Sequence, residues 1–369
     1  MRHRVALVCV TAGPGGVEHH VLDLAGALDN SVDLAILAAD GGWLATRAQA
    51  AGLKVLAVPE PQGNADLRTL SAVRSALLGF GPRIVHSHLA RSDWYAWLAT
   101  RGMRNVVLIS TEHGISDDRP DIYGGFLKRT VHGLGHRLRL RDAAATIAVS
   151  EATARALSSR YTRLRLEPPV VIRPSVDIER FRGIGGKVRS QGQPLPVAMI
   201  GRLSPEKGPE VLLRAAALCR DRGYPLNLEI AGEGPLRGQL EALRDELGLE
   251  SSVVFAGHID DVSAVLRKCA VLAVPSLAEN LPLVVLEALS SGVPVVASDV
   301  GGIGEIVQDR VNGLLVPASD ESALADALVI LWRDDALLHD MSQAALASVE
   351  GFGPFPAAQK IVAVYERIA

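Results

Sequence analysis

Hydrophobic runs alternate with amphipathic stretches along this 369-residue chain, and this alternation is the feature that most limits its possible folds. In the first half, runs that predict β-strands cover residues 4–10, 33–37, 54–58, 83–86, 106–110 and 144–149. Helical patterns between them cover residues 17–28, 67–80 and 91–101. The strands are near-continuous in Val, Ile and Leu, so both of their faces are expected to be buried. Such burial is typical of a parallel sheet with helices on both sides.

The alternation breaks once, at residues 183–196, where turn-forming and polar residues predict a linker. Beyond the linker, predicted strands cover residues 197–200, 227–230, 252–255, 271–274 and 293–297. Predicted helices there cover residues 210–222, 236–247, 283–290 and 323–332. The sequence therefore predicts an α/β protein of two Rossmann-like, doubly wound domains, residues 1–182 and 197–350, that face each other across a cleft. Ligands are expected at the carboxyl ends of the strands.

Charge and cysteine usage exclude several functional classes. The formal net charge of −3 provides no global basic field, which argues against nucleic acid as the main partner. Cys9, Cys219 and Cys269 are far apart in apolar stretches, so we expect isolated buried thiols rather than disulfides or a metal site. The first apolar run stops at Thr11, too early for a signal peptide, and no later run is long enough to span a membrane. We therefore expect a soluble cytoplasmic protein.

A glycine-rich turn, Gly13-Pro14-Gly15-Gly16-Val17-Glu18, follows the first predicted strand and opens a helix. Such a turn lets a ligand approach the backbone and the helix N-terminus. The dinucleotide fingerprint would need Gly where Glu18 stands, and no Gly-Lys is followed by Ser or Thr as in a P-loop. An oxidoreductase is therefore disfavoured. A tight turn without any ligand would have the same sequence.

Two further motifs follow strands of the second half. Gly201-Arg202-Leu203-Ser204-Pro205-Glu206-Lys207-Gly208 places a planar guanidinium and a compact ammonium where this architecture binds phosphates. Together Arg202 and Lys207 can neutralise a diphosphate without a metal, although a surface turn with solvated charges is the alternative.

The other motif places Glu279 in a loop and Glu287 inside the helix that follows, with Pro282 expected at the first helical position. Amides at Leu281 and Leu283 suit an anion. A carboxylate can accept from both hydroxyls of a ribose.

In combination these motifs resemble the retaining glycosyltransferases of sequence family 4, which have the GT-B fold. The resemblance covers nearly the whole chain and is strongest in Gly-Arg-Leu-x-x-Glu-Lys-Gly and in the spacing of Glu279 and Glu287. Weaker matches in the same order are Gly232-Glu233-Gly234-Pro235-Leu236, Phe255-Ala256-Gly257, Gly292-Val293-Pro294-Val295-Val296-Ala297 and Gly301-Gly302 with Glu305.

The resemblance implies roles for individual residues. Arg202 and Lys207 would hold the donor diphosphate, Glu287 the ribose, and Glu279 would lie near the transferred sugar. Further donor contacts are implied at Glu233, Asn280, Leu281 and Leu283. The resemblance also implies retention at the anomeric carbon, no metal or other cofactor, and a C-terminal helix in residues 351–369 that returns to the first domain. The chain departs from the family pattern at Pro282, where many relatives have Gly, and at Arg173-Pro174-Ser175-Val176-Asp177.

In the first half, the resemblance implies that Gly15 and Gly16 close on the donor and that His113 acts in catalysis or sugar binding. A loop hydrogen bond is the alternative for His113. His86 and His88 alternate at a strand end and point the same way. No third ligand is identifiable, so zinc is not expected. We expect His88 and Glu112 to contact the acceptor.

Residues 128–141 are locally basic. They predict contact with a phosphate-bearing acceptor or, peripherally, with an anionic membrane surface, and the alternative is a solvated helix face. The main hypothesis is transfer from a nucleotide diphosphate sugar, with UDP favoured, to a glycan, a lipid-linked sugar or a small natural product. The alternative is a non-catalytic sensor of nucleotide sugars. An epimerase or phosphorylase has no motif of its own in the chain.

Overall fold

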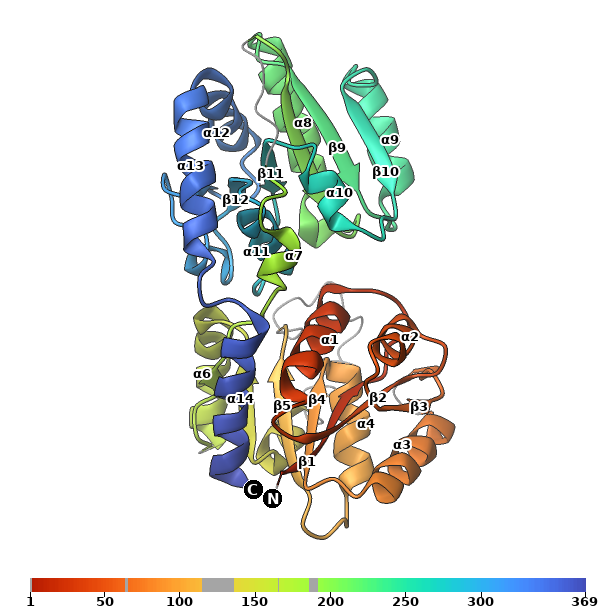
Figure 1. Ribbon diagram of the computed structural model, residues 1–369. Coiled ribbons are helices and arrows are strands. Elements are labelled where there is room, and N and C mark those ends of the chain that lie inside the picture. The colour runs from red at the N-terminus through yellow and green to blue at the C-terminus, as the bar shows by residue number, and fades with distance from the viewer. Residues whose placement is uncertain (1, 64–65, 115–135, 165, 186–191) are drawn as a thin grey trace. The chain divides into compact units, whose positions relative to one another are not determined.

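The structure is a computed structural model that describes residues 2–63, 66–114, 136–164, 166–185 and 192–369 (Figure 1). The chain forms two compact units. The first contains Met1–Ser175 and Gly353–Ala369, and the second contains Val176–Phe352. In the described residues, no helix is long and apolar enough to cross a membrane.

The first unit is built on a seven-stranded parallel sheet in the order β3-β2-β1-β4-β5-β6-β7. Its strands are β1 Arg4–Cys9, β2 Asp33–Ala39, β3 Val55–Val58, β4 Ile84–His88, β5 Val107–Glu112, β6 Ala145–Ala148 and β7 Val170–Val171. Its helices are α1 Gly16–Leu28, α2 Trp43–Ala50, α3 Leu67–Phe80, α4 Ala90–Thr100, α6 Glu151–Leu164 and α14 Pro354–Ile368.

The side chains of β1 show why helices cover both faces of this sheet. Val5 and Leu7 join a core formed with α1, α2 and α14. Ala6 and Val8 point the other way and join a core formed with α3 and α4. Since side chains alternate along a strand, a run that is apolar at every position needs a hydrophobic layer on each side.

The second unit has a six-stranded parallel sheet in the order β10-β9-β8-β11-β12-β13. Its strands are β8 Leu195–Ile200, β9 Leu226–Ala231, β10 Val253–Gly257, β11 Val271–Val274, β12 Val295–Ser298 and β13 Gly313–Val316. Its helices are α7 Ile178–Phe181, α8 Pro209–Asp221, α9 Arg237–Glu246, α10 Val262–Leu266, α11 Leu283–Ser290, α12 Glu321–Arg333 and α13 Asp335–Ser348. Again one strand serves two cores: Val271 and Ala273 pack with α8 and α12, and Leu272 and Val274 pack with α10 and α11.

The boundary between the units does not lie in the stretch that was expected to be the linker. The chain passes from one unit to the other at Ser175 and returns at Phe352. Phe181, which lies before residues 183–196, is buried in the core of the second unit, and β8 already begins at Leu195. The helix α14 belongs to the first unit, where Ile361 and Tyr365 are buried against α1. The three cysteines are free and buried, as predicted from their spacing.

Candidate functional site

Four loops of the second unit converge because parallel strands end at the same edge of a sheet. They follow β8, β9, β11 and β12. Backbone hydrogen bonds join them: Leu203 N donates to Glu233 O at 3.0 Å and Leu277 N to Glu206 O at 2.8 Å. Gly302 N donates to Asn280 O at 2.6 Å. The two sequence motifs that resemble a donor site are therefore parts of one connected loop cluster.

Glycine is required at several positions of this cluster, of which Gly208 and Gly301 are two. Gly208 and Gly301 have φ angles of +64° and +59°, in the left-handed region that other residues rarely adopt. A Cβ atom on Gly208 would overlap the carbonyl oxygen of Pro275, and one on Gly301 would overlap that of Glu279. These glycines let the loops after β8 and β12 lie directly against the loop after β11.

The cluster brings Lys207 and Glu279 into an ion pair, although they are 72 residues apart in the chain. The Ser276 hydroxyl donates to the same carboxylate oxygen of Glu279 at 3.0 Å. The side chains of Lys207 and Glu279 are 28% and 10% exposed, so the ammonium remains open to a ligand while the carboxylate holds it. Glu279 is thus placed to orient a cation.

A second carboxylate, Glu206, lies in the same turn and was overlooked at the sequence level. Burial acts to raise the pKa of Glu206, but the Ser204 hydroxyl at 2.5 Å and the charges of Lys207 and Arg202 outweigh it and lower that pKa. Glu206 therefore stays ionised beside the two cations. Its position inside the Gly-Arg-Leu-x-x-Glu-Lys-Gly motif was the available signal. Arg202 itself is exposed.

Helix α11 begins at Leu283, as the predicted helix 283–290 does, and Pro282, expected at the first helical position, is its N-cap. Proline has no N–H to donate, and the Pro282 side chain provides no cap hydrogen bond. The first amides of α11 can therefore meet an anion. Leu281 is buried in the core, Glu287 is half-buried in the second turn, and Glu233 is exposed with Arg237 at 3.2 Å.

In the first unit, Gly15 is the N-cap of α1 and Gly16 its first residue. Gly15 is extended, with φ −161°, so its backbone conformation does not require glycine. A Cβ atom on Gly15 would lie 2.5 Å from a carboxylate oxygen of Glu18, so that side chain would have to shift. Glu18 is buried and accepts a hydrogen bond from the Thr11 hydroxyl. Glu18, the residue that departs from the dinucleotide fingerprint, thus packs against the glycine-rich turn.

Histidines gather at the carboxyl ends of β4 and β5. His88 Nδ1 and His113 Nε2 lie 3.0 Å apart, so one of these rings donates to the other. His20 of α1, which the sequence analysis did not single out, is buried beside both. One ring nitrogen from each of the three lies within 4.8 Å of the others, so the histidines that the fold groups are His20, His88 and His113 and not the expected pair His86 and His88. His86 has different partners, with Tyr365 Oη and Thr111 Oγ1 each 2.7 Å from one of its nitrogens.

The histidines of this group are neutral at pH 7. Burial lowers the pKa of His20 to about 4 and that of His86 to about 3. Burial and the neighbouring imidazoles hold the pKa of His88 and of His113 well below the ordinary value. A neutral imidazole has one donor and one acceptor nitrogen, which suits contact with sugar hydroxyls.

Glu112, expected to contact the acceptor, is instead engaged in a buried ion network. Arg139 Nη2 lies 2.8 Å from Glu112 Oε1, 3.4 Å from Asp93 Oδ2 and 2.7 Å from His136 Nδ1. Burial raises the pKa of Asp93 to about 6 despite the guanidinium. Glu112 therefore has a demonstrated structural partner, and contact with an acceptor stays a prediction.

Arg139 belongs to the basic stretch 128–141, of which residues 128–135 lie outside the described residues. In the described part, Arg139 and Leu140 are buried, and Arg137 and Arg141 are exposed. This part is neither an open basic patch nor a uniformly solvated helix face.

Comparison with known proteins places this geometry in a family. Residues 14–180 match the family model described as Glycosyltransferase Family 4, and residues 185–347 match that of Glycosyl transferases group 1. The D-inositol 3-phosphate glycosyltransferase of Mycobacterium avium is 32% identical over 302 residues, which cover 77% of this chain and 69% of that protein. The chain belongs to the family 4 glycosyltransferases.

Other similar proteins include the D-inositol 3-phosphate glycosyltransferase of Nocardia farcinica, 34% identical over 73% of this chain. The alignment spans 63% of the Nocardia protein. Among solved structures, Anabaena HepE in complex with UDP-glucose has a TM-score of 0.83 at 20% identity and covers 99% of this chain and 100% of that one. Sucrose-phosphate synthase from Thermosynechococcus elongatus has a TM-score of 0.81 at 21% identity, covering 99% of both chains. These likenesses show the GT-B fold predicted from sequence.

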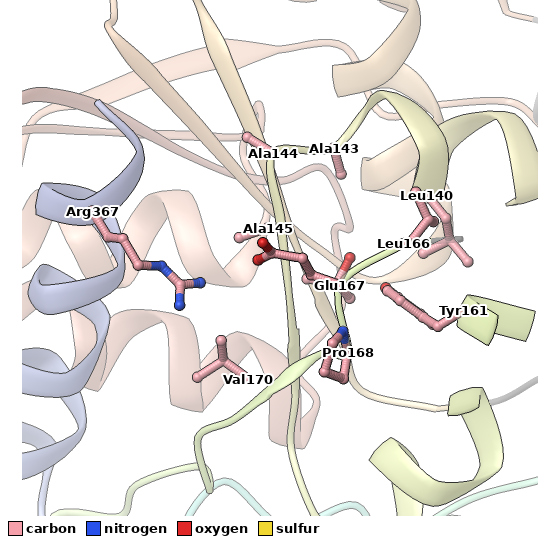
Figure 2. Close-up of a pocket in the computed structure, with 11 residues that line it drawn as sticks. Leu140, Ala143, Ala144, Ala145, Tyr161, Leu166, Glu167, Pro168, Val170 and Arg367 are labelled. Carbon is pink, nitrogen blue, oxygen red and sulfur yellow. The ribbon is translucent and has the colours of Figure 1, made fainter. Parts of the chain in front are cut away.

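The first unit of this family 4 member also contains a cavity. Its volume is about 220 Å³. Figure 2 shows it in the first unit, with Tyr161 of α6, Glu167 and Arg367 of α14 around it. None of the residues predicted to be catalytic or to bind donor or acceptor lines this cavity, although Leu140 of the basic stretch 128–141 does. The loop cluster and the histidine group, rather than this cavity, are the candidate functional sites.

Proposed function

We propose that the protein is a retaining glycosyltransferase that uses a nucleotide diphosphate sugar, with UDP as the favoured nucleotide. The observation that carries this proposal is the Lys207–Glu279 ion pair, held in loops whose glycines admit no side chain. Arg202 follows β8 in the same turn. The printed description of HepE, a complex with UDP-glucose, supports the choice of UDP.

The two cations would act on the leaving group. As the bond between the sugar and the diphosphate breaks, negative charge grows on the phosphate oxygens. A preorganised guanidinium and ammonium stabilise that charge more than they stabilise the ground state. Glu279 keeps Lys207 from turning into solvent, so little reorganisation is needed during the reaction. Charge neutralisation by side chains underlies our proposal that turnover requires no divalent metal.

The remaining residues of the cluster would position the donor. Glu287 would accept hydrogen bonds from the ribose hydroxyls, and the first amides of α11 would meet phosphate or sugar oxygens. Asn280, Leu281 and Leu283 contribute backbone to this region, and Glu233 lies in the adjacent loop after β9.

Front-face displacement with retention is the mechanism we propose. In it the acceptor attacks from the side on which the diphosphate departs. Glu279 already pairs with Lys207, so it is unsuited to be a covalent nucleophile. His113 and His88 would hydrogen-bond the sugar or the acceptor as neutral imidazoles, and Gly15 and Gly16 would admit the donor to the α1 N-terminus. The acceptor classes remain a glycan, a lipid-linked sugar or a small natural product. The relatives named D-inositol 3-phosphate glycosyltransferase add a polyol phosphate to the acceptors worth testing.

The test is a donor screen followed by turnover. Purified protein is titrated with UDP-, GDP- and ADP-sugars, and product is identified by NMR with the acceptor classes named above. Lys207→Ala and Arg202→Ala should each lose about 1.5–3 kcal/mol of donor or transition-state binding. That loss corresponds to roughly ten- to hundredfold in affinity, rate or both. Lys268→Ala, at an exposed lysine of the same unit, is the matched control and should behave as wild type.

Wild-type turnover in both Lys207→Ala and Arg202→Ala would refute the assigned roles. Donor binding without release of nucleotide, with every acceptor tried, would instead support the sensor hypothesis. An inverted product would contradict retention.

A further inference from the structure

Three imidazoles from separate parts of the first unit meet at one point. His20 comes from α1, His88 from the last position of β4, and His113 from the residue after β5. One nitrogen of each ring lies within 4.8 Å of the other two, and the His88 and His113 nitrogens are 3.0 Å apart. With metal–nitrogen distances of about 2.0–2.1 Å, two ligands of a tetrahedral ion lie roughly 3.3 Å apart. The His88–His113 separation is therefore close to that of two ligands on one ion.

The protein leaves part of this cluster unsatisfied. His88 is fully buried, and its Nε2 has no hydrogen-bond partner among the described residues. Buried ring nitrogens normally have a partner, so this ring is incompletely satisfied by the chain. Its Nδ1, the nitrogen that faces His113, is the one placed to meet an ion, and Nε2 would then carry the ring proton. His86, in contact with His88, is not available for such a group because Tyr365 and Thr111 occupy both of its nitrogens.

We propose that His20, His88 and His113 form a binding site for one divalent transition-metal ion of the zinc class. Three neutral imidazoles without a carboxylate select Zn²⁺, Co²⁺, Ni²⁺ or Cu²⁺ over the oxygen-preferring Mg²⁺ and Ca²⁺. The nearby carboxylate of Glu112 is held by Arg139. The fourth position of a tetrahedral ion is thus left for water or for an oxygen of a bound molecule.

His20 is the ligand that must adjust. Its Nδ1 accepts a long hydrogen bond, 3.4 Å, from the Ser175 amide. A metal on Nε2 would move the ring proton to Nδ1. The Nδ1–H group would then face the Ser175 N–H, and the hydrogen bond would be lost because both groups are donors. A metal on Nδ1 would displace the amide directly. Either way one weak hydrogen bond is exchanged for a metal–nitrogen bond.

This site goes beyond the proposed function and does not rest on it. The same lone pairs that His88 and His113 would offer to a sugar or an acceptor would be taken by the ion. Bound metal should therefore inhibit sugar transfer, although transfer itself requires none. Metal binding can be measured without any substrate, so failure of one proposal is distinguishable from failure of the other.

The test uses full-length, untagged protein, stripped with chelator and titrated with Co²⁺. Tetrahedral Co²⁺ gives a visible absorption band, which Zn²⁺ should abolish by competition and Mg²⁺ should leave unchanged. We expect one equivalent of Co²⁺ in the wild type and at least a tenfold loss of affinity in His20→Ala. His19→Ala is the matched control, because His19 is the preceding residue of the same helix and its Nδ1 bonds to Gly15 O at 2.9 Å. This control should bind as the wild type does.

His113→Ala gives an independent variant in case His20→Ala does not fold, which circular dichroism will establish. The proposal is overturned if the wild type binds Co²⁺ no more tightly than the folded variants, or if His19→Ala loses the band as well.

Discussion

Replacing Arg139 with methionine removes the charge from the centre of a buried network and keeps most of the side-chain volume. The guanidinium is 4% exposed, and it faces the side chains of Glu112 and Asp93, which are 6% and 1% exposed. At an effective dielectric constant of about 20, a charge pair at these separations attracts by roughly 5–6 kcal/mol before desolvation is counted. Breaking a buried pair by removing one partner costs about 3–5 kcal/mol, since the other charge stays buried. We expect Arg139→Met to destabilise the first unit by that amount at pH 8.

The loss should shrink as the pH falls. The pKa of Asp93 is already raised to about 6 by burial, and removing the neighbouring cation raises it further. A carboxyl whose pKa is higher in the folded than in the unfolded state binds more protons when folded. Its protonation therefore stabilises the fold progressively as the pH falls from the folded value towards the ordinary value of 3.8. The difference in unfolding free energy between wild type and Arg139→Met should be smaller at pH 5 than at pH 8.

Urea unfolding followed by tryptophan fluorescence measures this effect. Trp43, Trp94 and Trp97 lie in the first unit, and the fourth tryptophan, Trp332, lies in the second. A Trp332→Phe background makes the signal specific to the first unit. Arg141→Met, at an exposed arginine two residues along the chain in the helical stretch 136–142, is the control and should stay within about 0.5 kcal/mol of its background. Equal effects of the two substitutions, or a loss that does not depend on pH, would refute the reasoning.

Four further outcomes are expected. Gly301→Ala should unfold at lower urea concentration than Gly223→Ala and should lower turnover. Both glycines have positive φ, but only Gly301 lies against the Glu279 carbonyl. Equal effects of the two substitutions would contradict the role assigned to Gly301. Glu279→Gln should lower kcat by roughly tenfold or more, because an amide oxygen can accept a hydrogen bond from Lys207 but no longer forms an ion pair with it, and unchanged steady-state kinetics would contradict this. His113→Ala should lower turnover while the donor Kd, measured by calorimetry, stays within about twofold of the wild-type value. A large increase in the donor Kd would instead indicate that His113 binds the donor. Excess chelator should leave turnover intact, whereas a requirement for Mn²⁺ would contradict the proposed role of Arg202 and Lys207.

Much of the fold could be predicted from sequence because the strands of a parallel sheet have a recognisable pattern of apolar residues. Each central strand is buried on both faces, so runs such as that of β1 read as uninterrupted apolar residues, and the intervening helices have their own period. The short strand β13, Gly313–Val316, was missed. Four residues that begin with glycine carry too little periodic signal, and their pairing with β12 identifies them as a strand.

The motifs alone singled out the residues that we propose for the donor site. Arg202, Lys207 and Glu279 lie in loops that follow strands, and the topology of such a sheet brings strand ends to one edge; Glu287 lies in the second turn of α11. What the motifs did not contain was the partner of each charge. Lys207 and Glu279 are joined only because Gly208 and Gly301 let three loops come into backbone contact.

The first unit shows the same limit more strongly. Nothing in the local sequence of His20 distinguishes it from His19, yet one faces His88 and His113 and the other bonds to the turn before its helix. Likewise Arg139 reads as one of several basic residues, but two acidic side chains from α4 and β5 make it a buried structural charge. Sequence records which residues an element contains and which face they share. The identity of the group across that face depends on packing between elements, and only the tertiary structure decides it.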